Sequence, residues 1–479
     1  MPESELKNKT AKGLFWGGMS NGIQQLLNLF FGIFLARLLS PGDYGMVGML
    51  TIFSGIAASL QEAGFISALI NRKGDNHEDY NAVFWFSICT SFCLYLILFS
   101  SAPLIAGFFH NPELMPLARY IFIGFFIVSF GIPQQAFLTK HLMVKQKAIA
   151  YIVAIVCSGT VGVIMASNGY AYWGIATQTL VYVFVITVLC WAMSPWRPSF
   201  NITFKPIGEM FPFSCKMLIT NVFNQINSNI FSVILGRFYS KNEVGDYTQA
   251  NKWNYMGYSL IHGMVSSVSQ PVLASVNDER ERQLRIFRKM VRFTAFVSFP
   301  AMFGLSLIAP EFITIAITDK WMNSAQILQI LCIAGAFVPI CNLFSSLLVS
   351  KGRSGIHMWS FVTLGVLQLV VMVAIHNLGI RTMVIVYSAI NILWLLVWYW
   401  FVRKETGYRF WNLAMDILPY LIITSAVMVA TYFLTKSIDN IYCLLAAKIA
   451  IAAVLYILIM RLSNAATFKE AVAYFRSRL

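Results

Sequence analysis

The sequence predicts an all-α polytopic membrane protein of about fourteen transmembrane helices, and three observations support this class. Hydrophobic residues make up 58% of the 479 positions and charged residues only 11%, whereas a soluble protein has about a quarter of its residues charged. Uncharged runs long enough to cross a membrane recur along the chain. Basic residues gather in alternate loops between these runs, and little chain is left for a soluble domain.

The predicted spans follow one another in chain order. The first two, at 14–39 and 44–70, are among five more polar segments, with 211–235, 247–276 and 440–460, but they reach the length of about 20 residues that a membrane helix needs. The run at 82–112 holds one span and its exit loop, whereas 148–196 should turn back at the Ser-Asn-Gly of 167–169 and provide two spans. The remaining spans are expected at 120–139, 211–235, 247–276, 293–310, 321–350, 354–380, 382–402, 417–435 and 440–460.

The distribution of basic residues predicts the orientation of the spans. With the N-terminus in the cytoplasm, 25 of the 35 Lys and Arg residues fall in inner loops, 6 in outer loops and 4 within spans. Because inner loops of membrane proteins are rich in Lys and Arg, both termini are predicted to be cytoplasmic. The net charge of +15 then reflects topology, and no nucleic-acid partner is expected. Residues 1–12 lead into the first span without a cleavage site of small residues, so no removable signal peptide is expected.

Two further segments are expected at the inner surface. The run 278–292 carries six basic residues, which either bind an anionic partner or lipid headgroup or, as we favour, anchor the chain at the inner leaflet. At the C-terminus, one helical face collects Phe468, Val472, Phe475 and Leu479. This pattern predicts an amphipathic helix that lies on the membrane surface.

An internal repeat at an offset of 200 residues predicts two related lobes. Residues 35–45 (LARLLSPGDYG) align with 235–245 (LGRFYSKNEVG), with Arg, Ser, an acidic residue and Gly in register. Because both copies follow an even number of spans, they should insert with the same orientation. We therefore expect two pseudo-symmetric six-helix bundles, at 1–200 and 201–410, followed by helices 13 and 14 and a cytoplasmic amphipathic tail at 411–479.

Motifs of soluble enzymes are missing from the sequence. It has no Gly-Lys dipeptide and hence no Walker A loop to bind ATP. The segment 18–22 (GMSNG) matches a nucleophile elbow, but it lies in a predicted membrane helix instead of a strand–turn–helix. The six His and eight Cys residues lack metal-ligand spacing. No catalytic residue, cofactor or metal is therefore predicted.

The candidate binding residues are amides at membrane depth. In the first span the amides recur at i, i+3, i+4 and i+7, and the seventh span repeats this stripe. Lipid does not hydrate such groups, so each stripe must face protein or a water-filled cavity. The alternative is interhelical hydrogen bonding; we favour a cavity because the stripes occupy equivalent places in both lobes. The residues are Asn21, Gln24, Gln25 and Asn28 in the first span and Asn221, Asn224 and Gln225 in the seventh.

Charged residues within or beside the spans extend this candidate site. Lys216 and Lys252 border the amide-rich region, and Arg37 and Arg237 end its two helices, which predicts a cationic cavity suited to an anion such as phosphate. Glu62 is interpreted as the only clear carboxylate within a span, and it either pairs with one of these cations or serves as a proton site. Two other basic residues, Arg119 and Lys448, can extend along the helix to the membrane surface, and for Lys448 we favour this reading.

The chain resembles the polysaccharide flippase family of the multidrug/oligosaccharidyl-lipid/polysaccharide (MOP) exporter superfamily. The resemblance rests on 35–45, on 60–65 (LQEAGF) with 68–70 (ALI), and on the repeat copy around 236–237. It implies export of a polyprenyl-linked oligosaccharide, in bacteria an undecaprenyl pyrophosphate repeat unit, from the inner to the outer leaflet of the cytoplasmic membrane by alternating access. It also implies a lipid tail outside the cavity near helices 13 and 14, and it leaves open a coupling proton or sodium ion and contact with polysaccharide polymerase or export machinery.

Two rival functions follow from the same features. Drug/cation antiporters of the superfamily share the lobe plan but need an acidic ion site, whereas the surplus charge here is basic. A membrane glycosyltransferase or ligase would need a large outer loop with catalytic residues, and all predicted outer loops are short. The sequence therefore favours a transporter that is not an enzyme.

Overall fold

The protein is described here by a computed structural model that covers residues 3–62, 65–72, 74, 76–277, 279–463 and 468–470. This part of the chain forms seventeen α-helices and two short 3₁₀ helices, η1 and η2, and contains no strand. The chain divides into two compact units, Met1–Gly245 and Asp246–Leu479. The predicted all-helical class is thus confirmed, whereas the predicted lobe boundaries stay a prediction.

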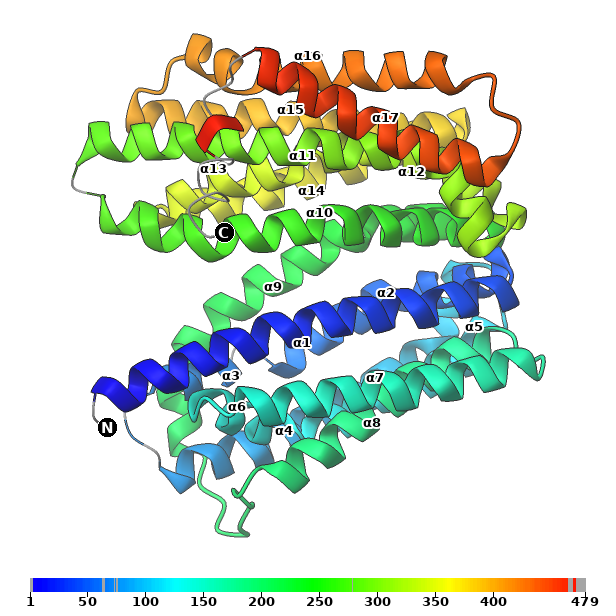
Figure 1. The fold of residues 1–479 in the computed structure, drawn as a ribbon. Coiled ribbons are helices and arrows are strands. Elements are labelled where there is room, and N and C mark those ends of the chain that lie inside the picture. The colour runs from blue at the N-terminus through cyan, green and yellow to red at the C-terminus, as the bar shows by residue number, and fades with distance from the viewer. Residues whose placement is uncertain are drawn as a thin grey trace. The chain divides into compact units, whose positions relative to one another are not determined.

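The first unit is a bundle in which α1 packs along α7, α7 along α8, and α2 along α9 (Figure 1). A break at Phe130 and Gly131 separates α5 from α6, and the two helices meet at an angle of 46°. The helices are α1 (Glu3–Leu38), α2 (Pro41–Glu62), α3 (Phe65–Asn71), α4 (His77–Phe108), α5 (Leu114–Ser129), α6 (Ile132–Lys140), α7 (Val144–Ser167), α8 (Tyr172–Met193), α9 (Lys205–Phe238) and the first turn of α10 (Lys241–Ser275).

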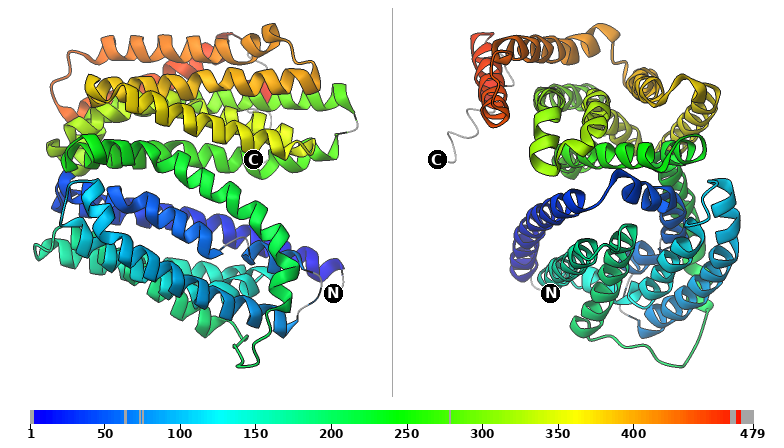
Figure 2. Two further views of the ribbon diagram at one scale, coloured as in Figure 1. Left: turned by 180° about the vertical axis from the view of Figure 1, so that it is seen from behind. Right: turned by 90° about the vertical axis from the view of Figure 1, so that its right-hand side faces the viewer.

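The second unit is built around α11, which packs against α12, α16 and α17. The last two helices, orange to red, lie at the outer edge of this unit (Figure 2). Besides the rest of α10, the unit contains α11 (Arg280–Ile317), η1 (Asp319–Trp321), α12 (Met322–Gly335), α13 (Val338–Ser350), α14 (Ser354–Ala374), η2 (His376–Leu378), α15 (Ile380–Thr406), α16 (Phe410–Thr435) and α17 (Ile441–Leu462).

Ten helical segments of the described chain are long and apolar enough to cross a membrane, or eleven when the bent pair α5 and α6 counts as one span. The three helices α1, α9 and α10 are 36, 34 and 35 residues long but are not among these segments. All three carry the amide and charged residues singled out in the sequence, which lower their hydropathy. The chain is a multi-pass helical membrane protein, and the count of about fourteen spans stays a prediction.

The internal repeat appears in the structure at the helix junctions. The break between α1 and α2 falls two hundred residues before that between α9 and α10, at residues 38–41 and 238–241. Each following helix begins with the same capping box. The backbone N–H of Ser40 donates to Asp43 Oδ2 at 2.9 Å and that of Ser240 to Glu243 Oε2 at 3.0 Å, while the backbone N–H of each acidic residue donates to the serine Oγ. The conserved spacing of Ser and acid within this chain is therefore explained by helix capping.

The glycine that ends each repeat motif is required by a close backbone approach. A Cβ on Gly45 would lie 2.8 Å from the carbonyl carbon of Lys241, and a Cβ on Gly245 would lie 2.5 Å from that of Pro41. Ordinary carbon–carbon contacts are about 3.5–4.0 Å. The first turns of α2 and α10 therefore cross at these two glycines, and any larger residue would separate them.

Several predictions fall on parts of the chain that the structure does not describe. The predicted C-terminal surface helix lies outside the described residues apart from 468–470, so its residues Val472, Phe475 and Leu479 are not placed. The cytoplasmic orientation of both termini likewise stays a prediction.

Candidate transport site

Part of the predicted amide stripe on α1 lines a cavity in the first unit. Asn21 and Gln24 border a space of about 210 Å³ together with Lys147 and Tyr151 of α7. The Gln24 Nε2 group donates to Ser20 Oγ at 2.8 Å, one helical turn earlier. This cavity brings amide and ammonium donors together, a chemistry that suits sugar hydroxyls and phosphate oxygens. Lys147 falls between the predicted spans 120–139 and 148–196, so it was expected in an inner loop and not beside the stripe.

The other amides of the two stripes are half-buried except Asn28, which is exposed. Gln25 on α1 does not border the cavity lined by Asn21, and Asn221 and Asn224 lie along α9. Gln225 packs against α2, where a Cβ added to Gly55 would lie 2.5 Å from its Oε1. For Gln225 the contact favours the alternative that some of these amides hold helices together.

The two arginines that end α1 and α9 have different surroundings. Arg37 is exposed. The guanidinium of Arg237 donates to the Phe108 carbonyl at 2.5 Å and lies 2.8 Å from His110 Nδ1. Arg237 thus connects the end of α9 to the turn that follows α4 by hydrogen bonds. Its role in substrate binding stays a prediction.

The remaining predicted site residues lie on separate helices. Glu62 ends α2, and Lys216 lies in α9, but their side chains are outside the part of the chain that the structure describes. Lys252 lies in α10, within the second unit, and is half-buried. Their assembly into one cationic cavity therefore stays a prediction.

The second unit contains a buried ion pair that the sequence analysis missed. Lys448 Nζ of α17 lies 2.6 Å from Glu311 Oε1 of α11, and it also donates to the Leu307 carbonyl at 3.2 Å. The side chains of Lys448 and Glu311 are only 7% and 11% exposed. The prediction that Lys448 extends to the membrane surface is therefore wrong, because its charge is neutralised inside the helix bundle.

The reading of Glu62 as the only clear carboxylate within a span is also wrong. Glu311 lies inside α11, which continues past Pro310 to Ile317, and Asp416 lies inside α16. The charge-free run 293–310 ends at Glu311, so the sequence suggested that the span ended there. The helix in fact continues through Pro310, which a search for uncharged residues alone does not indicate.

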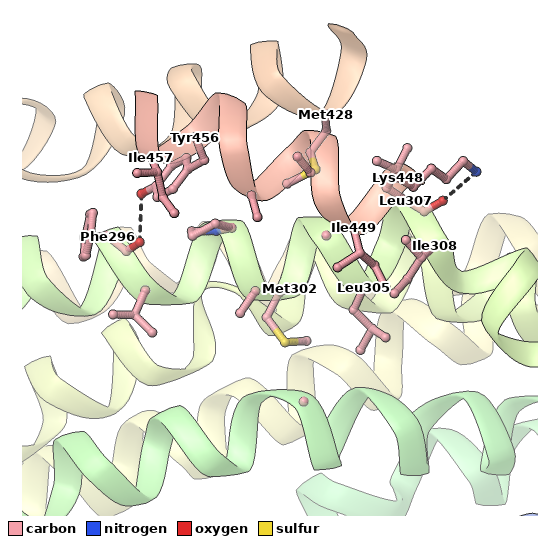
Figure 3. Close-up of a pocket in the computed structure, with 17 residues that line it drawn as sticks. Phe296, Met302, Leu305, Leu307, Ile308, Met428, Lys448, Ile449, Tyr456 and Ile457 are labelled. Carbon is pink, nitrogen blue, oxygen red and sulfur yellow. Dashed lines mark hydrogen bonds between the residues drawn. The ribbon is translucent and has the colours of Figure 1, made fainter. Parts of the chain in front are cut away.

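An apolar groove of about 680 Å³ runs between α11, α16 and α17 (Figure 3). Met302, Leu305 and Ile308 of α11 face Met428 of α16 and Ile449 of α17, with Lys448 toward one end and Tyr456 and Ile457 toward the other. Nearly all of the lining is hydrocarbon. Such a groove suits a flexible apolar chain more than a polar solute.

Polar side chains stabilise α11 where its two prolines interrupt it. Pro300 lacks the N–H that would bond the Phe296 carbonyl, and Tyr456 Oη donates to that oxygen at 2.8 Å (Figure 3). Pro310 likewise frees the Ser306 carbonyl, which accepts from Gln329 Nε2 of α12 at 3.3 Å. One wall of the groove is therefore a helix with two interior prolines, whose freed carbonyls accept hydrogen bonds from neighbouring helices.

No group of three or more His, Cys, Asp or Glu side chains that could hold a metal ion occurs within the described ranges. The polar groups found are amides, ammonium groups and single carboxylates, which bind and orient a ligand by hydrogen bonds and charge.

Comparisons with known proteins place the chain in a family. Residues 34–326 match the family described as polysaccharide biosynthesis protein. The chain is 26% identical to the teichuronic acid biosynthesis protein TuaB of Bacillus subtilis over 402 residues, 81% of each chain. It is 23% identical to the lipopolysaccharide biosynthesis protein WzxC of Escherichia coli over 354 residues, 73% of this chain and 71% of that one.

Solved structures share the fold. The lipid II flippase MurJ in an inward closed conformation superposes with a TM-score of 0.76 at 15% identity, covering 92% of this chain and 97% of MurJ. An inward-facing multidrug resistance MATE family transporter of the MOP superfamily gives a TM-score of 0.67 at 18% identity, covering 80% and 94%. The chain thus shares its helical fold with these two proteins. Because the family match spans more than half of the sequence, the chain belongs to the family described as polysaccharide biosynthesis protein.

Proposed function

We propose that this protein moves a polyprenyl-linked oligosaccharide from the inner to the outer leaflet of a bacterial cytoplasmic membrane by alternating access, without hydrolysing ATP. The observation that carries the proposal is the family match over 34–326, together with bacterial relatives named for teichuronic acid and lipopolysaccharide biosynthesis. Such polymers are built from hydrophilic units that cannot cross hydrocarbon unaided, because every buried hydroxyl or phosphate would lose its hydration.

The groove along α11 and α17 supports a lipid-linked substrate. A polyprenyl chain is apolar and flexible, and a lining of Met, Leu and Ile can adapt to it. The groove lies on the helices that correspond to predicted spans 13 and 14, where the family resemblance places the tail. We therefore assign part of the prenyl chain to this groove, while the head group travels through a separate polar site.

The polar site would replace the water that surrounds the head group. An anionic pyrophosphate loses several kcal/mol of solvation on leaving water unless donors and positive charge are already in place. We assign the charge to Lys216 and Lys252 and the neutral donors for sugar hydroxyls to Asn21 and Asn221. Amides recognise sugars by directional hydrogen bonds, so they would set which glycans pass.

A source of energy other than ATP fits the sequence, which has no Walker A loop. A proton or sodium gradient is the candidate, with a carboxylate such as Glu62 as the ion site. The polymerase and export machinery that use the flipped unit would be the partners on the outer side.

Deletion of the chromosomal gene tests the proposal in cells. The lipid-linked repeat unit should accumulate in the inner leaflet, and the surface polysaccharide should disappear while total lipid-linked sugar rises. Drug sensitivity without any change in glycan would instead support an antiporter like the MATE proteins, whose fold this chain shares.

A further inference from the structure

The first thirteen residues of α11 carry an unusual density of positive charge. Six basic residues lie between Arg280 and Arg292, at the helix end whose dipole is itself positive. Three of them, Arg285, Lys289 and Arg292, follow one another at i, i+4 and i+7 and so share one face of the helix. This placement is electrostatically unfavourable unless anions lie nearby.

The carboxylates of the second unit neutralise only part of this charge. Lys289 pairs with Glu470 at 2.8 Å, and Arg282 pairs with Glu279 at 2.9 Å. Asp416 of α16, whose side chain is 2% exposed, accepts from Arg288 Nε at 2.8 Å, and its Oδ1 lies 3.2 Å from Arg292 Nε. The Tyr408 hydroxyl also donates to Asp416 at 2.8 Å. One carboxylate thus serves two guanidinium groups, which leaves about one positive charge at the cluster.

The hydroxyl of Tyr408 keeps its proton in this cluster. Burial raises the pKa of Tyr408, and the neighbouring carboxylate of Asp416 raises it further. The tyrosine therefore acts as a neutral donor and adds no negative charge to the arginines. Arg292 and Arg288 have no second anion among the ion pairs of the described residues.

The uncompensated charge faces outward beside apolar side chains. The Arg292 side chain is 39% exposed, and Arg285 is exposed and takes part in no ion pair within the ranges that the structure describes. Phe293, next to Arg292, and Trp411, five residues before Asp416, are also exposed. Guanidinium groups beside exposed aromatic rings are typical of the boundary between lipid headgroups and hydrocarbon.

We propose that Arg285 and Arg292 bind the phosphate of an anionic phospholipid, with Arg292 oriented for this by Asp416. The occupant is a membrane lipid because the positive charge lies at the start of a helix that is long and apolar enough to cross a membrane, and exposed Phe293 follows Arg292 directly. Arg288 binds both oxygens of Asp416, at 2.8 and 3.1 Å, so Asp416 is shared and Arg292 keeps donors for a phosphate, which planar guanidinium groups bind through two hydrogen bonds. In the predicted topology this lipid belongs to the inner leaflet.

The test is native mass spectrometry of the purified full-length protein during titration with phosphatidylglycerol in detergent. Each basic contact is worth about 1 kcal/mol near an anionic surface, so Arg285→Gln/Arg292→Gln should need about 30-fold more lipid for half-occupancy. Arg285→Gln alone should need about 5-fold more. In both variants Arg288 still pairs with Asp416, so the helix contact is kept.

Two further variants separate a built site from general attraction. Arg403→Gln/Lys404→Gln removes the same charge from exposed positions at the end of α15, and it should bind phosphatidylglycerol like the unaltered protein. Arg285→Lys/Arg292→Lys keeps the charge but loses the planar set of guanidinium donors. The lipid it needs for half-occupancy should lie between that of the unaltered protein and that of Arg285→Gln/Arg292→Gln. Equal weakening by the two double Gln variants, or no weakening by Arg285→Gln, would overturn the proposal.

Discussion

Substitution of Gly45 by alanine tests the crossing of α2 and α10 at the repeat motifs. The added methyl carbon would lie 2.8 Å from the carbonyl carbon of Lys241 and closer still to its oxygen. That oxygen would lie only 1.8 Å from the methyl carbon. A close carbon–oxygen contact needs about 3.3 Å, so the two backbones must separate by about 1.5 Å. The obstructing atoms belong to backbone in the first turn of α10, which is held by the capping box of Ser240 and Glu243, so they cannot rotate away.

We expect Gly45→Ala to cost about 3 kcal/mol, the upper part of the range for overpacking, because the neighbour is backbone. The assay is the apparent melting temperature of purified protein, measured together with glycan export in cells. The matched control is Gly42→Ala, whose Cβ would meet the Asn242 side-chain oxygen at 2.6 Å. The Asn242 side chain can rotate away from the added methyl group, so the melting temperature of Gly42→Ala should be close to that of the unaltered protein. If Gly45→Ala melts and exports like Gly42→Ala, the close approach is not a constraint on this protein.

Three more predictions concern helix contacts and the substrate site. Lys448→Ala should destabilise the protein by about 3 to 5 kcal/mol, because it leaves the Glu311 charge buried and unpaired, whereas Glu311→Leu/Lys448→Met should recover most of that loss in thermal melts. Tyr456→Phe should cost about 1 to 2 kcal/mol in the same melts, because the carbonyl freed by a proline in α11 loses its donor. Lys216→Ala and Lys252→Ala should each reduce export while membrane abundance, measured by immunoblot, stays near normal; normal export in both would contradict a cationic cavity.

Local features of the fold were predictable from the sequence because they depend on neighbouring residues. The helix junctions at 38–41 and 238–241 follow from Ser and an acid three residues later, which cap the next helix in both repeats. The turn at Gly169 also matches, and this residue has a φ of 84° that glycine adopts without strain. Whether a polar helix crosses the membrane was harder to predict. The helices α1, α9 and α10 contain amides, which lower the hydropathy on which span prediction depends.

Contacts between distant helices could not be predicted. Lys448 and Glu311 are far apart in sequence, and only the packing of α17 on α11 makes them partners. The repeat showed that Gly45 and Gly245 are equivalent, but no local pattern indicates that their backbones touch. For the candidate site, the α1 stripe supplies Asn21 and Gln24 to the cavity, whereas their neighbour Lys147 comes from a helix more than a hundred residues later.

Transport by the isolated protein is the most direct test of the proposed function. Purified protein would be reconstituted into liposomes with a fluorescent glycan linked to polyprenyl pyrophosphate, and the fraction that a membrane-impermeant quencher reaches would be followed over time. We predict that the protein equilibrates the glycan between leaflets without nucleotide, and that an imposed proton or sodium gradient changes the rate. A glycan that stays in its original leaflet under every gradient, or that moves only when ATP is hydrolysed, would contradict the proposal.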